Sequence, residues 1–165
     1  PGTITARYPG HMIHVDVKKV GALREGGGWR VHGRGSAQDR TKHAARAGYT
    51  YLRSAVDGFS WLAYTEALPD EKTSTTVGFL HRARAWFAGH GITHVTRLVT
   101  DNGNAYRSKV VARAIRVWNS RHQRIRPYTP RHNGKVERYQ RVLADEFLYA
   151  RPYTSEAERT RTIHQ

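Results

Sequence analysis

The sequence predicts an α/β fold built on a mixed five-stranded sheet with helices on both faces. Two observations lead to this prediction. Three strand-like segments follow one another in the first part of the chain, and helical and strand-like segments alternate after them. Consecutive strands tend to pair antiparallel, whereas strands separated by helices tend to pair in parallel, so we expect both kinds of pairing in one sheet. The length of 165 residues is that of one domain.

The strands are predicted from alternating or β-rich runs. Residues 13–20 alternate between apolar and polar side chains, in the order Ile13, His14, Val15, Asp16, Val17 and Lys18. Residues 49–56 and 59–67 are rich in β-branched and aromatic residues, and the Asp57-Gly58 pair between them is typical of a two-residue hairpin turn. Further strands are expected at residues 94–100 and 123–125.

The helices are predicted from apolar residues that recur every three or four positions. One helix should cover about residues 72–88. Another should begin after Ser108, whose hydroxyl suits a helix N-cap, and it carries the stripe Val111, Ala114, Ile115 and Trp118. The segment 135–149 should form a third, with an inward face of Val136, Tyr139, Leu143 and Phe147. A last helical stretch should start at Thr154 or Ser155.

Residues 21–48 interrupt this pattern between the first and second strands. They are rich in glycine and show little periodicity. Such a long connection is unusual in one domain and often has a function. We therefore expect a single domain over residues 1–165 that carries a mobile basic insertion at about residues 21–48.

The composition excludes several classes of protein. The chain has no cysteine, which excludes disulfide scaffolds, cysteine zinc sites, iron–sulfur clusters and thiol nucleophiles. No apolar run is long enough to span a membrane, and residues 1–10 lack the apolar region of a signal peptide. The sequence thus predicts a cytoplasmic protein with no membrane partner.

The formal net charge of +15 predicts a polyanionic partner, most simply nucleic acid. Residues 18–46 carry a net charge of +6 and residues 101–141 a net charge of +9, so these two segments hold the whole excess. They are either two regions that face phosphates or parts of a generally basic, solvated surface.

The chain has only 13 acidic residues, so candidate catalytic carboxylates can be sought by elimination. Turns, helix ends, helix surfaces, the insertion and solvent account for ten of them: Glu25, Asp39, Asp57, Glu66, Asp70, Glu71, Asp145, Glu146, Glu156 and Glu158. Asp16, Asp101 and Glu137 remain. Each also has a simpler interpretation: Asp16 as an exposed position of an edge strand, Asp101 as part of an Asn-Gly turn, and Glu137 as a partner of the helix dipole.

Three strings that contain these acids, HVDVKK, TRLVTDNG and PYTPRHNGKVER, resemble the catalytic core of bacterial insertion-sequence transposases and retroviral integrases. This is the DDE family, which has a ribonuclease H-like fold. The 35 residues between Asp101 and Glu137 match the separation characteristic of the family. The similarity extends from about Gly10 to the end of the chain.

The resemblance implies that Asp16, Asp101 and Glu137 are the catalytic triad and bind two Mg²⁺ ions, which Mn²⁺ could replace. Such a site catalyses DNA strand cleavage and strand transfer at transposon ends and target DNA. Six residues are expected to bind DNA: Tyr128, Arg131, Asn133, Lys135, Arg138 and Arg141. Asn102 and His14 are expected to support the site, although a merely exposed position is the simpler reading of His14.

The resemblance also implies a homodimer or higher multimer that is bacterial and associates with the nucleoid. Family members usually carry an N-terminal module that binds DNA ends, and we expect this chain to be a core that lacks it and is truncated in its C-terminal helix. Two other functions stay open. One is a ribonuclease H-like nuclease, which the 35-residue spacing disfavours. The other is a catalytically inactive DNA-binding remnant, which the intact acids disfavour.

Overall fold

A computed structural model of the protein describes residues 5–37, 48–125 and 134–163. Within this part of the chain the strands form one five-stranded sheet in the order β3-β2-β1-β4-β5. The strands are β1 (Ile13–Gly21), β2 (Tyr49–Asp57), β3 (Ala63–Leu68), β4 (Arg97–Thr100) and β5 (Arg121–Arg124). The helices are α1 (Trp29–His32), α3 (Thr73–Gly89), α4 (Lys109–Val117), α5 (Gly134–Leu143) and α6 (Glu156–Ile163), with a 3-10 helix η2 (Asn104–Arg107) and a π-helix η4 (Ala144–Leu148).

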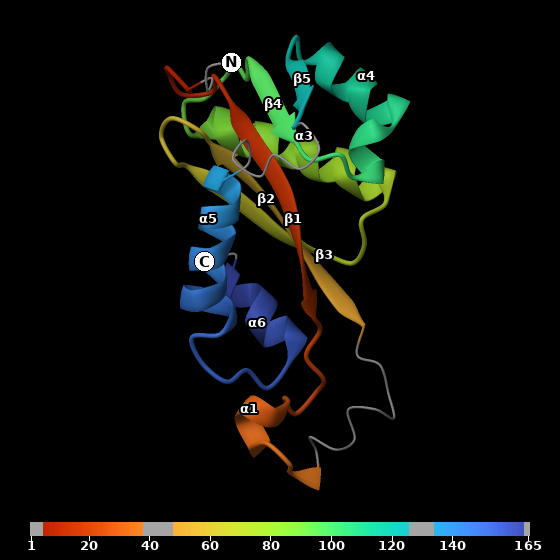
Figure 1. The fold of residues 1–165 in the computed structure, drawn as a ribbon, viewed down its shortest axis with the longest axis vertical. Helices are drawn as coiled ribbons and strands as arrows, with labels where there is room; N and C mark the ends of the chain where they lie inside the picture. Colours follow the sequence, from red (N-terminus) through yellow and green to blue (C-terminus); the bar gives the residue numbers. More distant parts are fainter. Residues whose placement is uncertain (1–4, 38–47, 126–133, 164–165) are drawn as a thin grey trace.

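The sheet is mixed, as predicted. β1 pairs antiparallel with β2 and parallel with β4, β2 pairs antiparallel with β3, and β4 pairs parallel with β5. Figure 1 shows α5 and α6 on one side of the molecule and α3 and α4 on the other. The long central strand β1 therefore lies between two helical layers, and both of its faces are covered.

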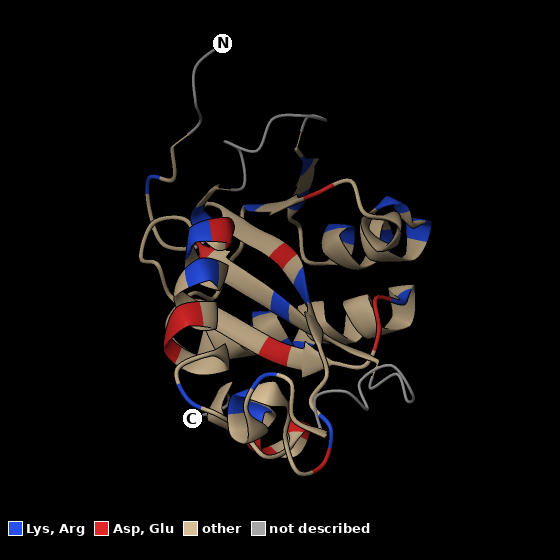
Figure 2. Cartoon of the chain, turned by 60° about the horizontal axis from the view of Figure 1, so that its bottom comes forward, with Lys and Arg blue, Asp and Glu red and all other residues tan. Residues whose placement is uncertain are grey.

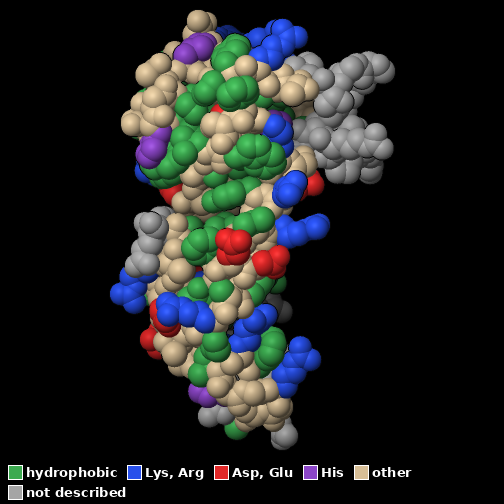
Figure 3. Space-filling model, turned by 90° about the vertical axis from the view of Figure 1, so that its left-hand side faces the viewer, with side chains coloured by type: hydrophobic (Ala, Val, Ile, Leu, Met, Phe, Trp, Pro, Cys, Tyr) green, Lys and Arg blue, Asp and Glu red, His purple; other side chains and the backbone are tan. Residues whose placement is uncertain are grey.

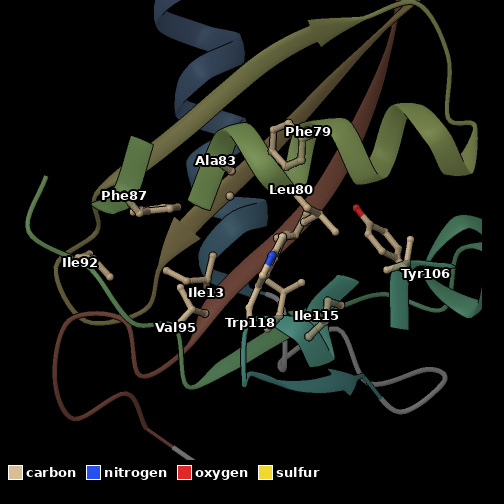
Figure 4. Close-up of a cluster of buried hydrophobic side chains, with 14 of the residues drawn as sticks. Ile13, Phe79, Leu80, Ala83, Phe87, Ile92, Val95, Tyr106, Ile115 and Trp118 are labelled. Carbon is tan, nitrogen blue, oxygen red and sulfur yellow. The ribbon is translucent and has the colours of Figure 1, made fainter. Parts of the chain in front are cut away.

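Each face of the sheet has its own apolar core. The larger core packs α3 and α4 against the side of β1 that carries Ile13 and Val15, and it includes Phe79, Phe87 and Ile115 (Figure 4). The smaller core lies under α5 and combines strand residues with Leu143, Ala144 and Leu148. Alternation along β1 thus assigns odd-numbered residues to one core and even-numbered ones to the other, where Asp16 lies.

The connection between β2 and β3 is longer than predicted. Val56 pairs with Ala63, and the Asp57 amide donates to the Leu62 carbonyl oxygen, so four residues rather than two form the turn. The Asp57 carboxylate organises it by accepting bonds from the backbone N–H and the hydroxyl of Ser60, each at 2.7 Å. The assignment of Asp57 to the turn was correct, but Asp-Gly did not indicate the turn's length.

The third long helix differs from its prediction at its C-terminal end. α5 ends at Leu143, and η4 continues it with π-type turns. A π turn takes about one residue more than an α turn, so the buried face moves along by one position. Leu148 is 2% exposed and lies in the core, whereas Phe147, which the helical pattern placed inward, is 38% exposed.

This shift gives a stability prediction. We expect Leu148→Ala to lower the free energy of unfolding by about 2–3 kcal/mol, because it leaves a cavity in the smaller core. The matched change Phe147→Ala should cost less than about 1 kcal/mol, because that ring faces solvent. Urea unfolding measures both. An equal or reversed order of the two losses would contradict the π-helical register.

The described half of the predicted insertion is not simply extended chain. It contains the short helix α1, and residues around it bond to the C-terminal part of the chain. The Leu23 amide donates to the Glu156 carboxylate at 2.7 Å, and the Arg159 guanidinium donates to the Gly21 carbonyl oxygen at 2.8 Å. Residues 38–47 of the insertion lie outside the described residues.

Two acids that the sequence analysis assigned to solvent or to a helix surface are in fact structural. Glu66 is 7% exposed, and its two carboxylate oxygens accept bonds from the Arg82 guanidinium, both at 2.7 Å. Glu156 accepts bonds from the Thr50 hydroxyl and from Arg159, also at 2.7 Å. Both stay outside the catalytic candidates, but for a different reason from the one predicted. No helix in the described ranges is long and apolar enough to cross a bilayer.

Candidate active site at the end of β4

Asp16 lies in the middle of the sheet. Its strand β1 has neighbours on both sides, β2 and β4, so Asp16 is not on an edge strand and that simpler interpretation is wrong. It is opposite Ser54 of β2, and alternation along β1 puts it on the face of Val20, which packs in the same cluster as Leu143 of α5. A half-buried carboxylate in a central strand is unfavourable unless a partner offsets its desolvation. This position therefore requires a functional or structural reason.

Asp101 directly follows β4 and lies beside Asp16. Val15 pairs with Thr100 in the parallel ladder, so the next residue on each strand is one of the two aspartates. Asp101 Oδ1 accepts a bond from the Gly103 amide at 2.9 Å, which also makes it part of a turn. Asp101 can therefore be part of both a turn and a site. Its Oδ1 organises the loop, and among the described residues no hydrogen bond engages Oδ2.

Glu137 lies in the first turn of α5 and is exposed. The electrostatics of Asp16 connect it with the two aspartates. The pKa of Asp16 is raised from 3.8 to about 6, mainly because the carboxyl group is buried and also because the charges of Asp101 and Glu137 disfavour a further negative charge. In this fold, the charges of Asp101 and Glu137 therefore act on the carboxyl group of Asp16.

As the side chains stand, no group of three or more His, Asp and Glu within the described ranges forms a ready metal site. The chemistry of the donors nevertheless fits a hard divalent cation, since the three carboxylates offer only oxygen atoms, which Mg²⁺ prefers. Burial is the main cause of the raised pKa of Asp16, the charges of Asp101 and Glu137 raise it further, and a bound cation would relieve that repulsion.

Two groups near the three acids were expected to support the site. The Asn102 side-chain amide donates to the Ile125 carbonyl oxygen at 2.7 Å, so it ties the loop after β4 to the end of β5. His14 lies on the same side of β1 as Asp16 but is 6% exposed, so its simpler reading as an exposed histidine is wrong. The supporting roles of Asn102 and His14 stay predictions.

The sequence analysis missed Arg53, which lies on the other face of the sheet. It is 1% exposed, donates to the Tyr106 hydroxyl at 2.5 Å and lies with its guanidinium carbon 5.4 Å from the Tyr106 ring centre. Arg53, Tyr106 and Asp101 line one pocket of about 410 Å³. The positive charge lowers the pKa of Asp16 against the larger effect of burial. The available signal was an arginine in the middle of a strand, close to the apolar residues Leu52, Ala55 and Val56.

The family model for the integrase core domain matches residues 6–130, and a second integrase core domain model matches residues 119–165. The first match alone covers most of the chain. The chain belongs to the integrase core domain family. Its architecture is that of a ribonuclease H-like integrase or transposase core. A comparison with curated proteins gave no match.

Solved structures support the fold of this integrase core. A chain of the simian T-cell lymphotropic virus intasome, in complex with PP2A regulatory subunit B56 gamma, has a TM-score of 0.66 at 24% identity over 91% of this chain and 44% of that one. The HTLV-2 integrase catalytic core domain in complex with magnesium gives 0.59 at 17% identity in a dimeric form, over 86% of this chain and 72% of that one. Its trimeric form gives 0.62 at 16% identity, over 94% and 82%. The chain thus spans less than half the length of the intasome chain.

The residues that the sequence analysis expected to bind DNA are only partly described. Tyr128, Arg131 and Asn133 lie outside the described residues. Arg138 and Arg141 are exposed on α5, where Figure 2 shows basic and acidic residues interspersed. The side of the molecule that carries α5 likewise shows both charge signs rather than a continuous basic surface (Figure 3).

Lys135 has intramolecular partners in this integrase core. Its ammonium group donates to the Gly58 carbonyl oxygen and lies 5.0 Å from the centre of the Trp61 ring. These contacts hold the start of α5 against the turn between β2 and β3, close to the position of Glu137. Its part in DNA binding stays a prediction, as it does for Arg138 and Arg141.

The raised pKa of Asp16 gives a second stability prediction. Asp16→Asn should raise the free energy of unfolding of the metal-free protein by about 2–3 kcal/mol at pH 7.5, because it removes a charge that the folded state disfavours. The gain should shrink as the pH falls through about 6 towards 4, since the folded wild type then takes up a proton on Asp16 before the unfolded chain does. Urea unfolding in the presence of a chelator measures this gain in stability, and the exposed Asp145→Asn serves as the control. A gain that does not change with pH would contradict the prediction.

Proposed function

We propose that this chain is the catalytic core of a metal-dependent polynucleotidyl transferase that cleaves DNA strands and joins them to target DNA. The observation that carries the proposal is the placement of Asp16. Its carboxylate lies in a central strand, next to Asp101 in register, and its pKa is raised by burial and by the charges of Asp101 and Glu137. Natural proteins retain such electrostatic strain mainly at functional sites.

Asp16, Asp101 and Glu137 are the residues that would hold two Mg²⁺ ions, with Mn²⁺ as a substitute. When bound, such a pair of ions activates the attacking oxygen and stabilises the leaving oxygen of an in-line phosphoryl displacement. A different part of the fold positions each acid. Asp16 is fixed by the sheet, Asp101 by its bond to Gly103, and Glu137 approaches from the exposed first turn of α5.

The chain's other groups have positioning roles in this proposal. Asn102 fixes the loop that presents Asp101 by bonding to Ile125. Lys135 fixes the start of α5, and hence Glu137, by bonding to Gly58. Arg138 and Arg141 are exposed on the same helix, and in this proposal they contact DNA phosphates. The substrates we propose are transposon ends and target DNA.

We also propose that the protein works as a homodimer or higher multimer on DNA. The solved structures that it resembles are an intasome and dimeric and trimeric forms of a catalytic core. These are properties of those proteins, and the present chain resembles them at 16–24% identity. Light scattering of the purified protein with and without a DNA duplex tests this part of the proposal.

Metal titration separates an active core from an inert DNA-binding remnant. We expect calorimetry to detect Mn²⁺ uptake by the wild type and at least a tenfold weaker uptake by Asp101→Asn and by Glu137→Gln. The control Glu146→Gln, exposed in η4, should bind as the wild type does. No uptake by the wild type, or uptake that both substitutions leave unchanged, would contradict the assignment.

A further inference from the structure

A second group of basic residues lies away from the three acids, where the insertion meets the C-terminal part of the chain. Trp29, Arg30 and Arg34, in and just after α1, face Tyr149 and Arg151 across a hollow of about 420 Å³. We call these five residues the arginine pocket. Figure 1 shows α1 beyond the C-terminal end of β1, at the opposite end of the molecule from β5.

Aromatic rings hold the arginines of this pocket in place. The Arg30 guanidinium carbon is 5.0 Å from the centre of the Trp29 ring and 4.9 Å from that of Tyr149, and Arg30 also donates to the Tyr149 carbonyl oxygen at 3.3 Å. The Arg34 guanidinium carbon is 4.6 Å from the Trp29 ring. Stacking restricts the faces of a guanidinium but leaves N–H groups at its edge available.

The charge of the arginine pocket is little compensated. Arg151 forms an ion pair with Glu158 at 3.5 Å, and its side chain is still 60% exposed. Over the described ranges, no carboxylate forms an ion pair with Arg30 or Arg34. Three guanidinium groups around one hollow, with a single carboxylate beside them, favour a ligand with more than one negative charge.

The pocket is fixed to the sheet rather than carried on a free loop. Leu23 and Gly21, which precede α1, bond to Glu156 and Arg159 of α6. Gly27 is also closely packed, because a side chain there would lie 2.9 Å from the Tyr153 carbonyl oxygen. The arginines therefore keep a defined position relative to β1, and hence to Asp16.

That position suits the backbone of a long DNA duplex. From Asp16 to Gly21, β1 advances about 16 Å at about 3.3 Å per residue. Successive phosphates of one DNA strand are about 3.4 Å apart along the axis, so the arginine pocket lies at least about five base pairs from the acids. Aromatic residues that orient arginines reduce the entropy lost on binding such a backbone.

We propose that the arginine pocket binds phosphodiester groups of the duplex DNA on which the catalytic edge acts, several base pairs from the reacting phosphate. This inference rests on the proposed function for the identity of the duplex. It assigns the basic insertion a role in holding DNA without reading its sequence, because phosphate contacts position a duplex but do not specify its bases.

Binding without catalysis tests the inference. Fluorescence anisotropy with a labelled duplex of about 20 base pairs, in chelator so that no strand is cut, should show roughly tenfold weaker binding for Arg30→Gln/Arg34→Gln than for the wild type. The salt slope should fall by about two, one unit for each lost phosphate contact. The matched control Arg113→Gln/Arg116→Gln removes the same charge from exposed positions of α4 and should change the affinity and slope much less.

The length of the DNA duplex provides a second test of the inference. A duplex of about four base pairs, closed by a hairpin loop so that it stays paired, is too short to span the distance between the acids and the pocket, so the defect of the pocket variant should be confined to the longer duplex. The single variant Arg34→Gln, which keeps the Arg30 stack, should show about half of the loss in salt slope. Equal losses in the pocket variant and the α4 control, or a loss that is the same for both lengths, would overturn the inference.

The two proposals can fail separately. Mn²⁺ uptake depends on Asp16, Asp101 and Glu137, and the pocket variant should keep it unchanged, which also shows that the variant is folded. If metal uptake is absent but the length-dependent defect appears, the proposed catalysis fails and the DNA contact stands. If uptake is normal and the defect is missing, the inference about the arginine pocket fails alone.

Discussion

Asp101→Asn and Glu137→Gln should each reduce metal-dependent strand cleavage and joining by on the order of a thousandfold or more, equivalent to about 4 kcal/mol of transition-state stabilisation. In the proposed site, each substitution removes an anionic oxygen from the three carboxylates that would hold the cations. Asparagine can still accept the bond from the Gly103 amide, so the loop after β4 should keep its shape. Gel assays of labelled duplexes with Mg²⁺ and Mn²⁺ measure the rates.

The controls for this experiment lie on the same helical segment as Glu137. Asp145→Asn and Glu146→Gln make the same chemical changes at exposed positions of η4 and should keep at least about half of the wild-type rate. Duplex binding in chelator should change little in the two site variants, because the arginines proposed to contact phosphate are untouched. Wild-type rates in either site variant would refute the triad.

Glu156→Ala should lower the free energy of unfolding by about 3–5 kcal/mol, the cost of leaving a buried arginine without its ion-pair partner. Arg159 is 4% exposed, and the substitution leaves its guanidinium with the Gly21 carbonyl oxygen as its remaining partner among the described residues. The Thr50 hydroxyl and the Leu23 amide lose their acceptor as well. One carboxylate therefore joins α6, β2 and the start of the insertion.

Urea unfolding measures this loss, with Arg161→Ala as a control on the exposed side of α6 that should change stability by less than about 0.5 kcal/mol. Glu156→Gln should lose less than Glu156→Ala, because an amide oxygen can still accept one of the bonds. A loss below about 1 kcal/mol for Glu156→Ala would contradict the structural role of this carboxylate.

The sequence predicted the mixed five-stranded sheet because strand alternation and helix periodicity are local signals. It also isolated Asp16, Asp101 and Glu137, since few acids were present and the family spacing matched. Their roles stay predictions. It did not reveal the ion pairs of Glu66 and Glu156, whose partners are brought close only by folding. The same holds for the buried Arg53: an arginine in an apolar strand looks like an exposed position until the packing of Tyr106 is known.

Other differences between the prediction and the structure arise from small differences in free energy, which leave no recognisable pattern in the sequence. The change from α- to π-helical turns after Leu143 moves burial from Phe147 to Leu148, and both are large apolar residues that a periodicity argument treats alike. The glycine-rich insertion has no period, so the sequence could not predict that α1 would stack against Tyr149.

The sheet order also restricts how two copies of the chain can associate. β5 is an edge strand, and its first and last residues, Arg121 and Arg124, are both exposed. Arg121 and Arg124 are three positions apart and therefore point to opposite faces of the sheet, so joining two copies through this edge would bring arginines together on both faces while two backbones come within about 5 Å of each other. Charged edges of this kind oppose the continuation of a sheet from one molecule into the next. A multimer of this chain should therefore leave β5 outside its interface.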